Sequence, residues 1–364
     1  MAALIPNTPA AAAQGSNASA SMDAIRKHAA DARWLDALDA LDALSADEID
    51  DEALAAEVRH HGERFRSARA AFEDPEDDNH QWQGRTERFG VETAFRYDNE
   101  GLLWLRTAGN MEDVDLFHTV AVLREIQLFG EWIPFLRQSC VIKAQDFARL
   151  LAHFTIGVRG VLSRDCVFRV AACNHALSGA SLFFEGRSLD DDVTEWNGAA
   201  VPPRDRSWGM DRMVVRDFYA RVQFLSQFSQ RCEVVVCVDL RTRLPRAVLD
   251  FFMKRLVGLF IWLWRRQSRY VSAHEQCPHR DAIAKDPAFY DEWLRFGSLR
   301  GNHRVDLRSG LTGRFPRRPK FVEFCAAQGW DGGELVVAPE DIEPDVVHDE
   351  APPAGLFARL NPFG

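Results

Sequence analysis

The chain has 364 residues, of which 46% are hydrophobic, so it is long enough for one large domain with extensions or for two domains. Its formal net charge of −10 weighs against nonspecific binding to nucleic acid, and we expect no nucleic-acid partner. The seven cysteines are scattered without a CxxC spacing, which favours a reducing compartment and free thiols.

The N-terminal segment, residues 1–21, is rich in alanine and serine and is predicted to be disordered. It has no basic region and no long apolar stretch, so it does not have the pattern of a secretory signal peptide. We therefore expect a cytoplasmic protein. The absence of acidic residues before Asp23 leaves targeting to an organelle open as an alternative.

Residues 22–73 predict a helical hairpin. Ser21 is suited to cap a first helix that runs to about Leu44, and Ser45-x-x-Glu48 has the capping-box pattern for a second helix. The second helix carries an apolar stripe with alternating spacings of four and three residues: Leu54, Val58, His61, Phe65, Ala68 and Phe72. We expect this hairpin to pack on the main domain or on a partner, and the protein to be a monomer or a weak dimer through these helices.

The pattern changes to β-structure after an acidic linker at 73–80. Strands are predicted at 88–97 and 102–108, around a short hairpin turn that contains Gly101. A helix at 113–128 and a compact aromatic turn at 129–135 follow. Further strands are predicted at 138–143, 147–157, 164–174, 180–190, 210–225 and 231–240. The polar loop at 190–208 is long enough to suggest a function.

A long apolar helix is predicted at 245–271, where Pro245 fits the first helical position. At 1.5 Å per residue it would be roughly 40 Å long. Its longest apolar run, residues 256–264, is well short of the roughly 20 residues that a membrane span requires. The helix is nevertheless too apolar for a surface helix, so it is expected to cover another part of the protein.

Sequence motifs give no sign of catalysis or of a bound cofactor. The chain has no GxSxG, HExxH or P-loop motif, and no GxGxxG motif after a strand. His274, Cys277 and His279 form the only metal-like group, and they lack an obvious fourth ligand. We expect no enzyme activity, no cofactor and no metal.

The order of these elements resembles the START domain, a lipid-binding helix-grip fold. The resemblance covers about residues 87–275, with 295 as its widest limit, and the long helix that begins at Pro245 is part of it. It is otherwise carried by four short stretches: Val114-Asp115-Leu116-Phe117, Leu128-Phe129-x-Glu131-Trp132-x-Pro134-Phe135, Leu162-Ser163-Arg164-Asp165 and Asp211-Arg212-Met213. It implies an α+β fold in which a curved antiparallel β-sheet wraps around a long C-terminal α-helix. The N-terminal helices are then an extension, 87–295 is the lipid-binding domain, and 296–364 is a mostly disordered tail.

The resemblance also implies one apolar lipid in a tunnel between the sheet and the helix, with possible transfer between membranes. The candidate lipid-binding residues are Phe168, Phe184, Met213, Val215, Val234, Val236, Phe252, Leu256, Leu259 and Leu263. The same residues could instead pack as a solid core. Two alternatives therefore remain open: a protein-interaction adaptor with a closed pocket, and a helix-grip enzyme of the cyclase or hydrolase kind.

Two sets of charged residues are further candidates. Arg164 and Arg212 could hold a polar headgroup, or they could form ion pairs at the rim of the domain. Peripheral membrane contact is proposed for a mixed basic and aromatic arc of the long helix, with Phe251, Lys254, Ile261, Trp262 and Arg265 as candidates. The alternative for this arc is burial beneath the N-terminal hairpin.

Overall fold

The structure is a computed structural model, and within residues 21–290 it describes all but a few short segments: 21–73, 82–114, 116–134, 136–158, 162–204, 210–226, 229–241 and 246–290. Side chains between 246 and 258 are outside the description. The two segments predicted to be disordered, 1–21 and 296–364, lie outside the described residues except for Ser21.

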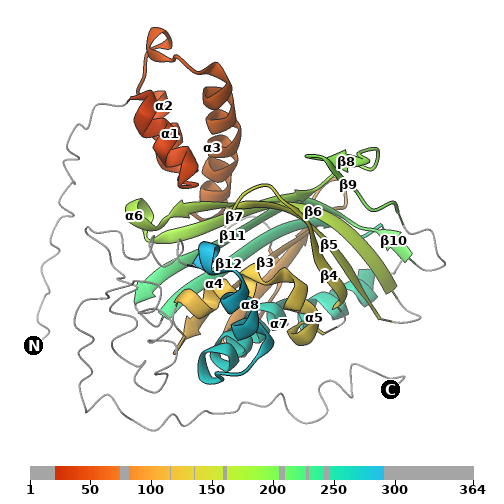
Figure 1. The fold of residues 1–364 in the computed structure, drawn as a ribbon. Coiled ribbons are helices and arrows are strands. Elements are labelled where there is room, and N and C mark those ends of the chain that lie inside the picture. The colour runs from red at the N-terminus through yellow and green to blue at the C-terminus, as the bar shows by residue number, and fades with distance from the viewer. Residues whose placement is uncertain are drawn as a thin grey trace, which may run out of the picture.

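One antiparallel sheet dominates the fold, and its strands follow the order β1-β2-β3-β12-β11-β7-β6-β5-β4 (Figure 1). The short strand β10 pairs with β6 in parallel. The strands are β1 Gln83–Arg88, β2 Val91–Tyr97, β3 Leu103–Glu112, β4 Leu136–Ala144, β5 Arg149–Val158, β6 Leu162–His175, β7 Ser181–Ser188, β10 Met210–Arg212, β11 Val214–Ser226 and β12 Ser229–Asp239. A separate hairpin, β8 Glu195–Trp196 with β9 Ala199–Ala200, lies in the long polar loop. The predicted α+β class and most predicted strands are confirmed.

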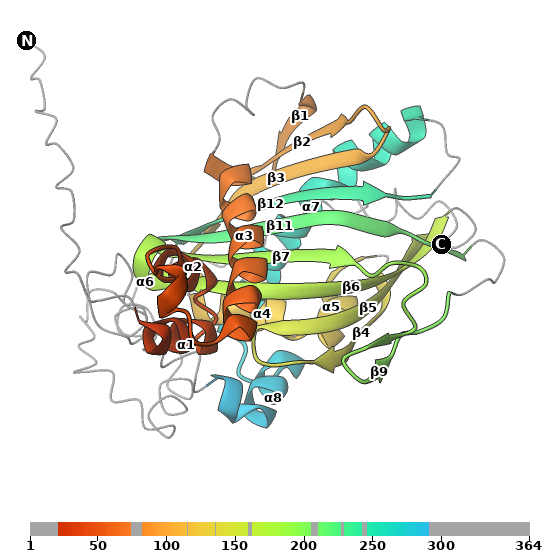
Figure 2. The same ribbon diagram turned by 90° about the horizontal axis from the view of Figure 1, so that it is seen from above.

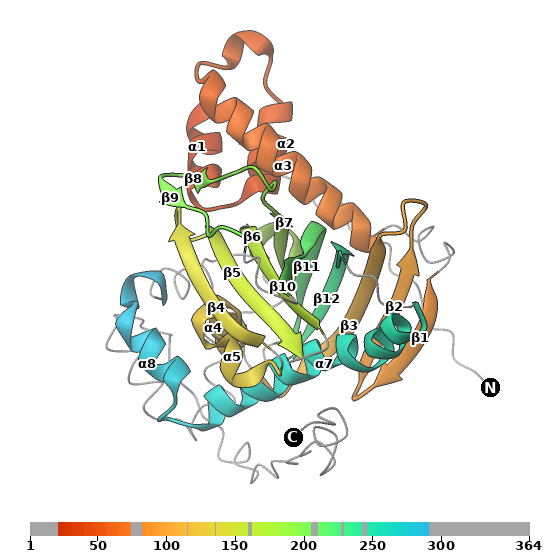
Figure 3. The same cartoon turned by 90° about the vertical axis from the view of Figure 1, so that its right-hand side faces the viewer.

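One face of the sheet, here called the inner face, is turned toward the C-terminal helices (Figures 1 and 3). The predicted long helix is confirmed as α7, Arg246–Ala273, and it crosses beneath the sheet. It packs against α4, Leu116–Arg124, where the buried Trp264 indole N–H donates to the Thr119 carbonyl at 3.0 Å. The other elements on this side are η3 Ile126–Leu128, α5 Phe129–Trp132 and α8 Pro278–Lys285. None of the described helices is long and apolar enough to cross a membrane.

The opposite face, here called the outer face, carries the N-terminal helices (Figure 2). These are α1 Met22–Ala30, α2 Trp34–Asp42, η1 Ala46–Glu48 and α3 Glu52–Glu73, and a single turn, α6 Ala176–Gly179, follows β6. In the predicted stripe of α3, Val58, Phe65 and Ala68 are fully buried. Val58 and Phe65 belong to a core that includes Phe183 of β7 and Val235 of β12, so the hairpin is packed on the sheet of its own chain.

Two local predictions about this hairpin were wrong. The first helix does not run unbroken to Leu44, because Ala32 adopts φ 52° and separates α1 from α2. The Ala32 carbonyl at this break accepts a hydrogen bond from the Asn174 amide of β6 at 2.9 Å. The capping box at Ser45 forms as predicted, but it caps the short helix η1, and α3 begins only at Glu52.

Candidate functional site

The six candidate strand residues lie on the inner face. Phe168, Met213, Val215 and Val236 belong to one apolar cluster, here called the inner-face cluster. Phe184 packs against the neighbouring core beside α7. Val234 shares the inner face because side chains of a strand alternate and Val236 lies two residues away.

The inner-face cluster is not fully removed from solvent. Phe168 and Val215 are buried, but many of its members are only half-buried although they lie on the face turned toward α7. The half-buried members are Tyr97, Leu105, Phe154, Val170, Met213, Phe218, Val236 and Leu240. Phe154, Val170 and Phe218 were missed as site residues, and their strand alternation was the signal that could have found them.

The four candidate helix residues divide into two pairs. Leu259 and Leu263 are 5% and 6% exposed and pack in the core that includes Phe117 of α4. Phe252 and Leu256 lie among the residues whose side chains are not described. A lining role for this part of α7 therefore stays a prediction.

The predicted membrane-docking arc is wrong at two of its residues. Ile261 is 0% exposed and Trp262 is 3% exposed. The turn between β1 and β2 covers this part of α7: the Phe89 ring lies 5.1 Å from the Trp262 ring, and Arg265 donates to the Phe89 carbonyl at 2.7 Å. Because the N-terminal hairpin lies on the outer face, the alternative that it covers Trp262 is wrong as well.

Of the remaining three members, Arg265 is half-buried and its guanidinium donates to the carbonyls of Phe89 and Asn110. Phe251 and Lys254 fall within the part of α7 whose side chains are not described. Docking through them stays a prediction.

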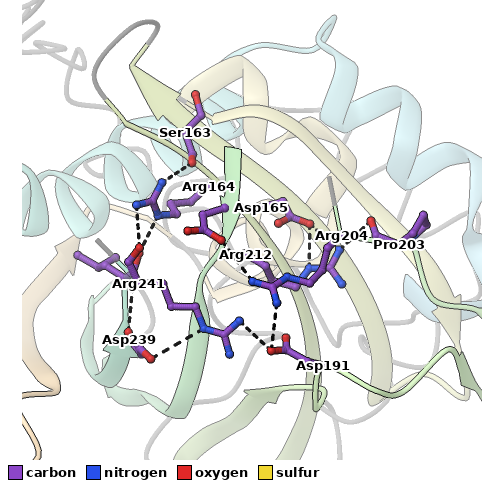
Figure 4. A network of polar contacts seen from close by, with 11 residues as sticks. Ser163, Arg164, Asp165, Asp191, Pro203, Arg204, Arg212, Asp239 and Arg241 are labelled. Carbon is purple, nitrogen blue, oxygen red and sulfur yellow. Dashed lines mark hydrogen bonds and ion pairs between the residues drawn. The ribbon is translucent and has the colours of Figure 1, made fainter. Parts of the chain in front are cut away.

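Arg212 forms a buried ion pair away from the inner face (Figure 4). Its guanidinium donates to Asp165 at 2.6 and 3.0 Å and to the Pro202 carbonyl at 3.0 Å. Burial alone would raise the Asp165 pKa, but the nearby His153 and Arg212 outweigh burial and lower it. Asp165 lies on the opposite face of β6 from Cys166, which is in the inner-face cluster. Arg212 therefore anchors the polar loop, and its assignment as a headgroup ligand in the pocket is wrong.

Arg164 occupies a different environment at the end of β6 (Figure 4). It is 8% exposed, and it donates to the carbonyls of Leu240, Ser163 and Arg241 at 2.7, 2.7 and 3.2 Å. Burial lowers its pKa. No carboxylate lies at ion-pair distance among the residues that the structure describes. Through these hydrogen bonds Arg164 holds the end of β12 in place. Because arginine has five N–H donors, Arg164 also keeps unused donors on the face of β6 that carries Cys166.

Ion pairs hold the long polar loop against the same end of the sheet. Arg241, just after β12, forms an ion pair with Asp191 of this loop at 2.8 Å (Figure 4). Arg204 lies between Asp191 and Asp211 at 3.5 and 3.3 Å. These contacts connect the loop to the strand that leads into α7.

No metal site is found in the described part of the chain, where no three His, Cys, Asp or Glu side chains gather closely enough to hold an ion. Cys277 instead precedes Pro278 at the start of α8. The imidazole of His279 is fully buried, and burial lowers its pKa to about 4.

Comparison with known proteins shows a START-like fold. No protein-family model matches the chain, and no curated protein matches its sequence. The crystal structure of human STARD10 matches with a TM-score of 0.50 and 16% identity over 66% of this chain and 89% of that chain. Human StAR-related lipid transfer protein 5 matches with a TM-score of 0.43 and 15% identity over 58% of this chain and 98% of that chain. The Zhui aromatase/cyclase from Streptomyces sp. R1128 reaches a TM-score of 0.31 at 10% identity, covering 47% of this chain and 96% of that chain.

At such identities the likeness establishes the fold alone. The described chain is thus a START-like helix-grip domain with an N-terminal helical extension on the outer face of its sheet.

Proposed function

We propose that the chain binds one apolar lipid between the inner face of the sheet and α7, and that it carries this lipid between membranes. The inner-face cluster is the observation that carries the proposal. Its side chains are apolar and share one face of the sheet, and more than half of them remain half-buried on the side that carries α7. An apolar ligand placed against them would remove further surface from water, at about 25 cal/mol per Å².

Arg164 gives this site a polar end. The Arg164 side chain lies on the same face of β6 as Cys166 and Phe168, next to the connection between β12 and α7. A buried guanidinium without a carboxylate is costly unless its donors are satisfied. A lipid whose headgroup carries a phosphate, carboxylate or carbonyl oxygen would accept from the donors that the three carbonyls leave unused.

Native mass spectrometry of the protein purified from cells is the first test of lipid binding. A co-purified species with the mass of a lipid, at one copy per chain, would support the proposal. A protein that carries no lipid and takes none from vesicles would contradict it and would favour an adaptor with a closed pocket.

A space-filling variant locates the ligand. Val236→Trp should reduce lipid uptake and leave the unfolding midpoint nearly unchanged, because the added ring would occupy the space assigned to the lipid. Leu225→Trp is the matched control, since Leu225 is 47% exposed on β11. If the inner face is a solid core instead, Val236→Trp should overpack it and cost about 1–3 kcal/mol of stability. Full uptake by such a destabilised variant would refute the assignment.

Transfer between membranes is a separate measurement. Donor vesicles loaded with a fluorescent lipid and unlabelled acceptor vesicles would report transfer by the protein. Ile261→Ser is not a test of docking, because Ile261 is buried and its replacement acts on the fold.

A further inference from the structure

The outer face of the sheet carries two neighbouring arginines that take no part in the proposed lipid site. Arg169 of β6 and Arg187 of β7 are directly opposite each other in antiparallel register. Directly opposite side chains have Cβ atoms about 4.5–5.5 Å apart, and like charges at such positions are destabilising. Both side chains are half-buried. Strand alternation places Arg187 on the same face as Glu185, which binds Arg64 of α3.

The other half-buried arginines beside this pair have carboxylate partners. Arg64 donates to Glu185 at 2.7 Å, and Arg221 donates to Glu233 at 2.8 Å. Arg149 is held by Asp146 at 2.6 Å and by Glu57.

Among the residues that the structure describes, Arg169 and Arg187 have no such partner. In the described parts of the chain neither guanidinium forms a hydrogen bond or an ion pair. Glu185 is already bound by Arg64, and Asp190 acts on Arg169 only from beyond ion-pair distance. Two cations thus lie opposite each other on neighbouring strands, without a counter-ion at ion-pair distance in the described part of the chain.

The electrostatic surroundings agree with this geometry. Burial lowers the pKa of Arg169, and the nearby Arg64 and Arg187 lower it further, against Glu185. Burial, Arg149, His60 and Arg169 together lower the pKa of the neighbouring His61 to about 4. The part of the outer face beside α3 is therefore positively charged. Near neutral pH His61 stays neutral and adds no further charge to it.

We propose that Arg169 and Arg187 form an anion site for a phosphate group. Guanidinium groups match phosphate oxygens with paired N–H donors, and a bridging phosphate would turn the repulsion between the two side chains into a shared attraction. The site lies on the face of the sheet that carries α1–α3, whereas the proposed lipid site lies on the inner face. The phosphate could belong to a soluble phosphate ester or to a lipid headgroup, which share this chemistry. The proposal does not depend on lipid binding.

Thermal unfolding in phosphate, compared with chloride at equal ionic strength and pH, tests the proposal. Inorganic phosphate should raise the unfolding midpoint of the wild type, and this rise should disappear in Arg169→Gln and in Arg187→Gln. Arg59→Gln is the matched control, since Arg59 is an exposed arginine of α3 and its removal changes the net charge equally. An equal rise in all four proteins would overturn the proposal.

The stability of each glutamine variant relative to the wild type, measured in chloride without phosphate, is a second test. Each glutamine variant should be as stable as the wild type or more stable in chloride, because it removes the repulsion between like charges. Loss of stability in chloride would mean that the arginine has a structural partner, and would overturn the proposal. Titration calorimetry with inorganic phosphate should give saturable binding that Arg169→Lys weakens, because lysine keeps the charge and loses the paired donors.

Vesicles separate the two sources of phosphate. Sedimentation with phosphatidylcholine vesicles that contain phosphatidic acid, lost in Arg169→Gln and kept in Arg59→Gln, would assign a lipid headgroup. Binding of inorganic phosphate without vesicle binding would assign a soluble phosphate ester. The absence of both would refute the site while leaving lipid binding on the inner face untouched.

Discussion

The ion pair between Arg64 and Glu185 gives a sharp test of how the N-terminal helices are attached. Glu185 is 3% exposed on the outer face, and the Arg64 side chain reaches it from α3 with two N–H groups. Removing one partner leaves a buried, uncompensated charge, which costs about 3–5 kcal/mol in comparable pairs. Arg64→Leu should therefore lower the free energy of unfolding by an amount in this range.

Replacing both partners should cost much less than the sum of the single changes. With Arg64→Leu and Glu185→Leu together, neither member of this pair leaves the other's charge buried alone, and such replacements are often neutral. This coupling energy between the two side chains is measured by urea unfolding of the wild type, the two single variants and the double variant.

The control is the exposed pair of Arg66 and Asp42, at 2.7 Å. Asp42→Asn should cost no more than about 1 kcal/mol, because exposed pairs contribute little. The reasoning is refuted if Arg64→Leu costs as little as this control, or if the two single changes simply add. Either outcome would mean that α3 does not dock on Glu185 in solution.

Three further changes have expected outcomes. Gly62→Ala should destabilise the protein, because the added Cβ would lie 2.6 Å from the Leu38 Cβ. This clash should outweigh the preference of alanine over glycine for helices, about 1 kcal/mol. A rise in the unfolding midpoint would contradict the packing of α2 on α3. Arg164→Gln should increase proteolysis at the β12–α7 connection through loss of its carbonyl contacts, with Arg59→Gln as the control. Stability should fall as the pH is lowered from about 6.5 towards 4, because the unfolded chain binds a proton on His61 more readily than the folded chain, where the His61 pKa is about 4. The free energy of unfolding measured against pH should show a flatter dependence in His61→Gln.

The sheet could be predicted from the sequence because alternation is a local signal. The predicted strands at 164–174 and 231–240 agree with β6 and β12 to within a few residues. The strand predicted at 88–97 begins only at Val91 as β2, because Phe89 and Gly90 both adopt positive φ and turn the chain between β1 and β2. Phenylalanine rarely adopts this conformation, so its propensity gave no warning of a turn. The preceding strand β1 was not predicted.

The site could be predicted only in part. Alternation places Phe168 and Val236 on one face, and which face is turned toward the helix followed from the resemblance. The helix was harder, since helical periodicity shows which residues share an arc but not which arc meets solvent. Ile261 and Trp262 were assigned to a polar, solvent-facing arc, whereas the turn at Phe89, far away in the sequence, covers Trp262.

This outcome explains why α7 is so apolar. An amphipathic helix needs one apolar stripe when a single neighbour covers it. In its C-terminal half α7 meets the sheet and α4, and the β1–β2 turn adds a third contact at Trp262. Arg265 remains compatible with this burial because its guanidinium donates to two backbone carbonyls, those of Phe89 and Asn110. Aromatic and basic residues close together on a helix therefore do not by themselves indicate membrane contact, because the same composition arises where a helix is enclosed and its arginines bind the ends of neighbouring strands.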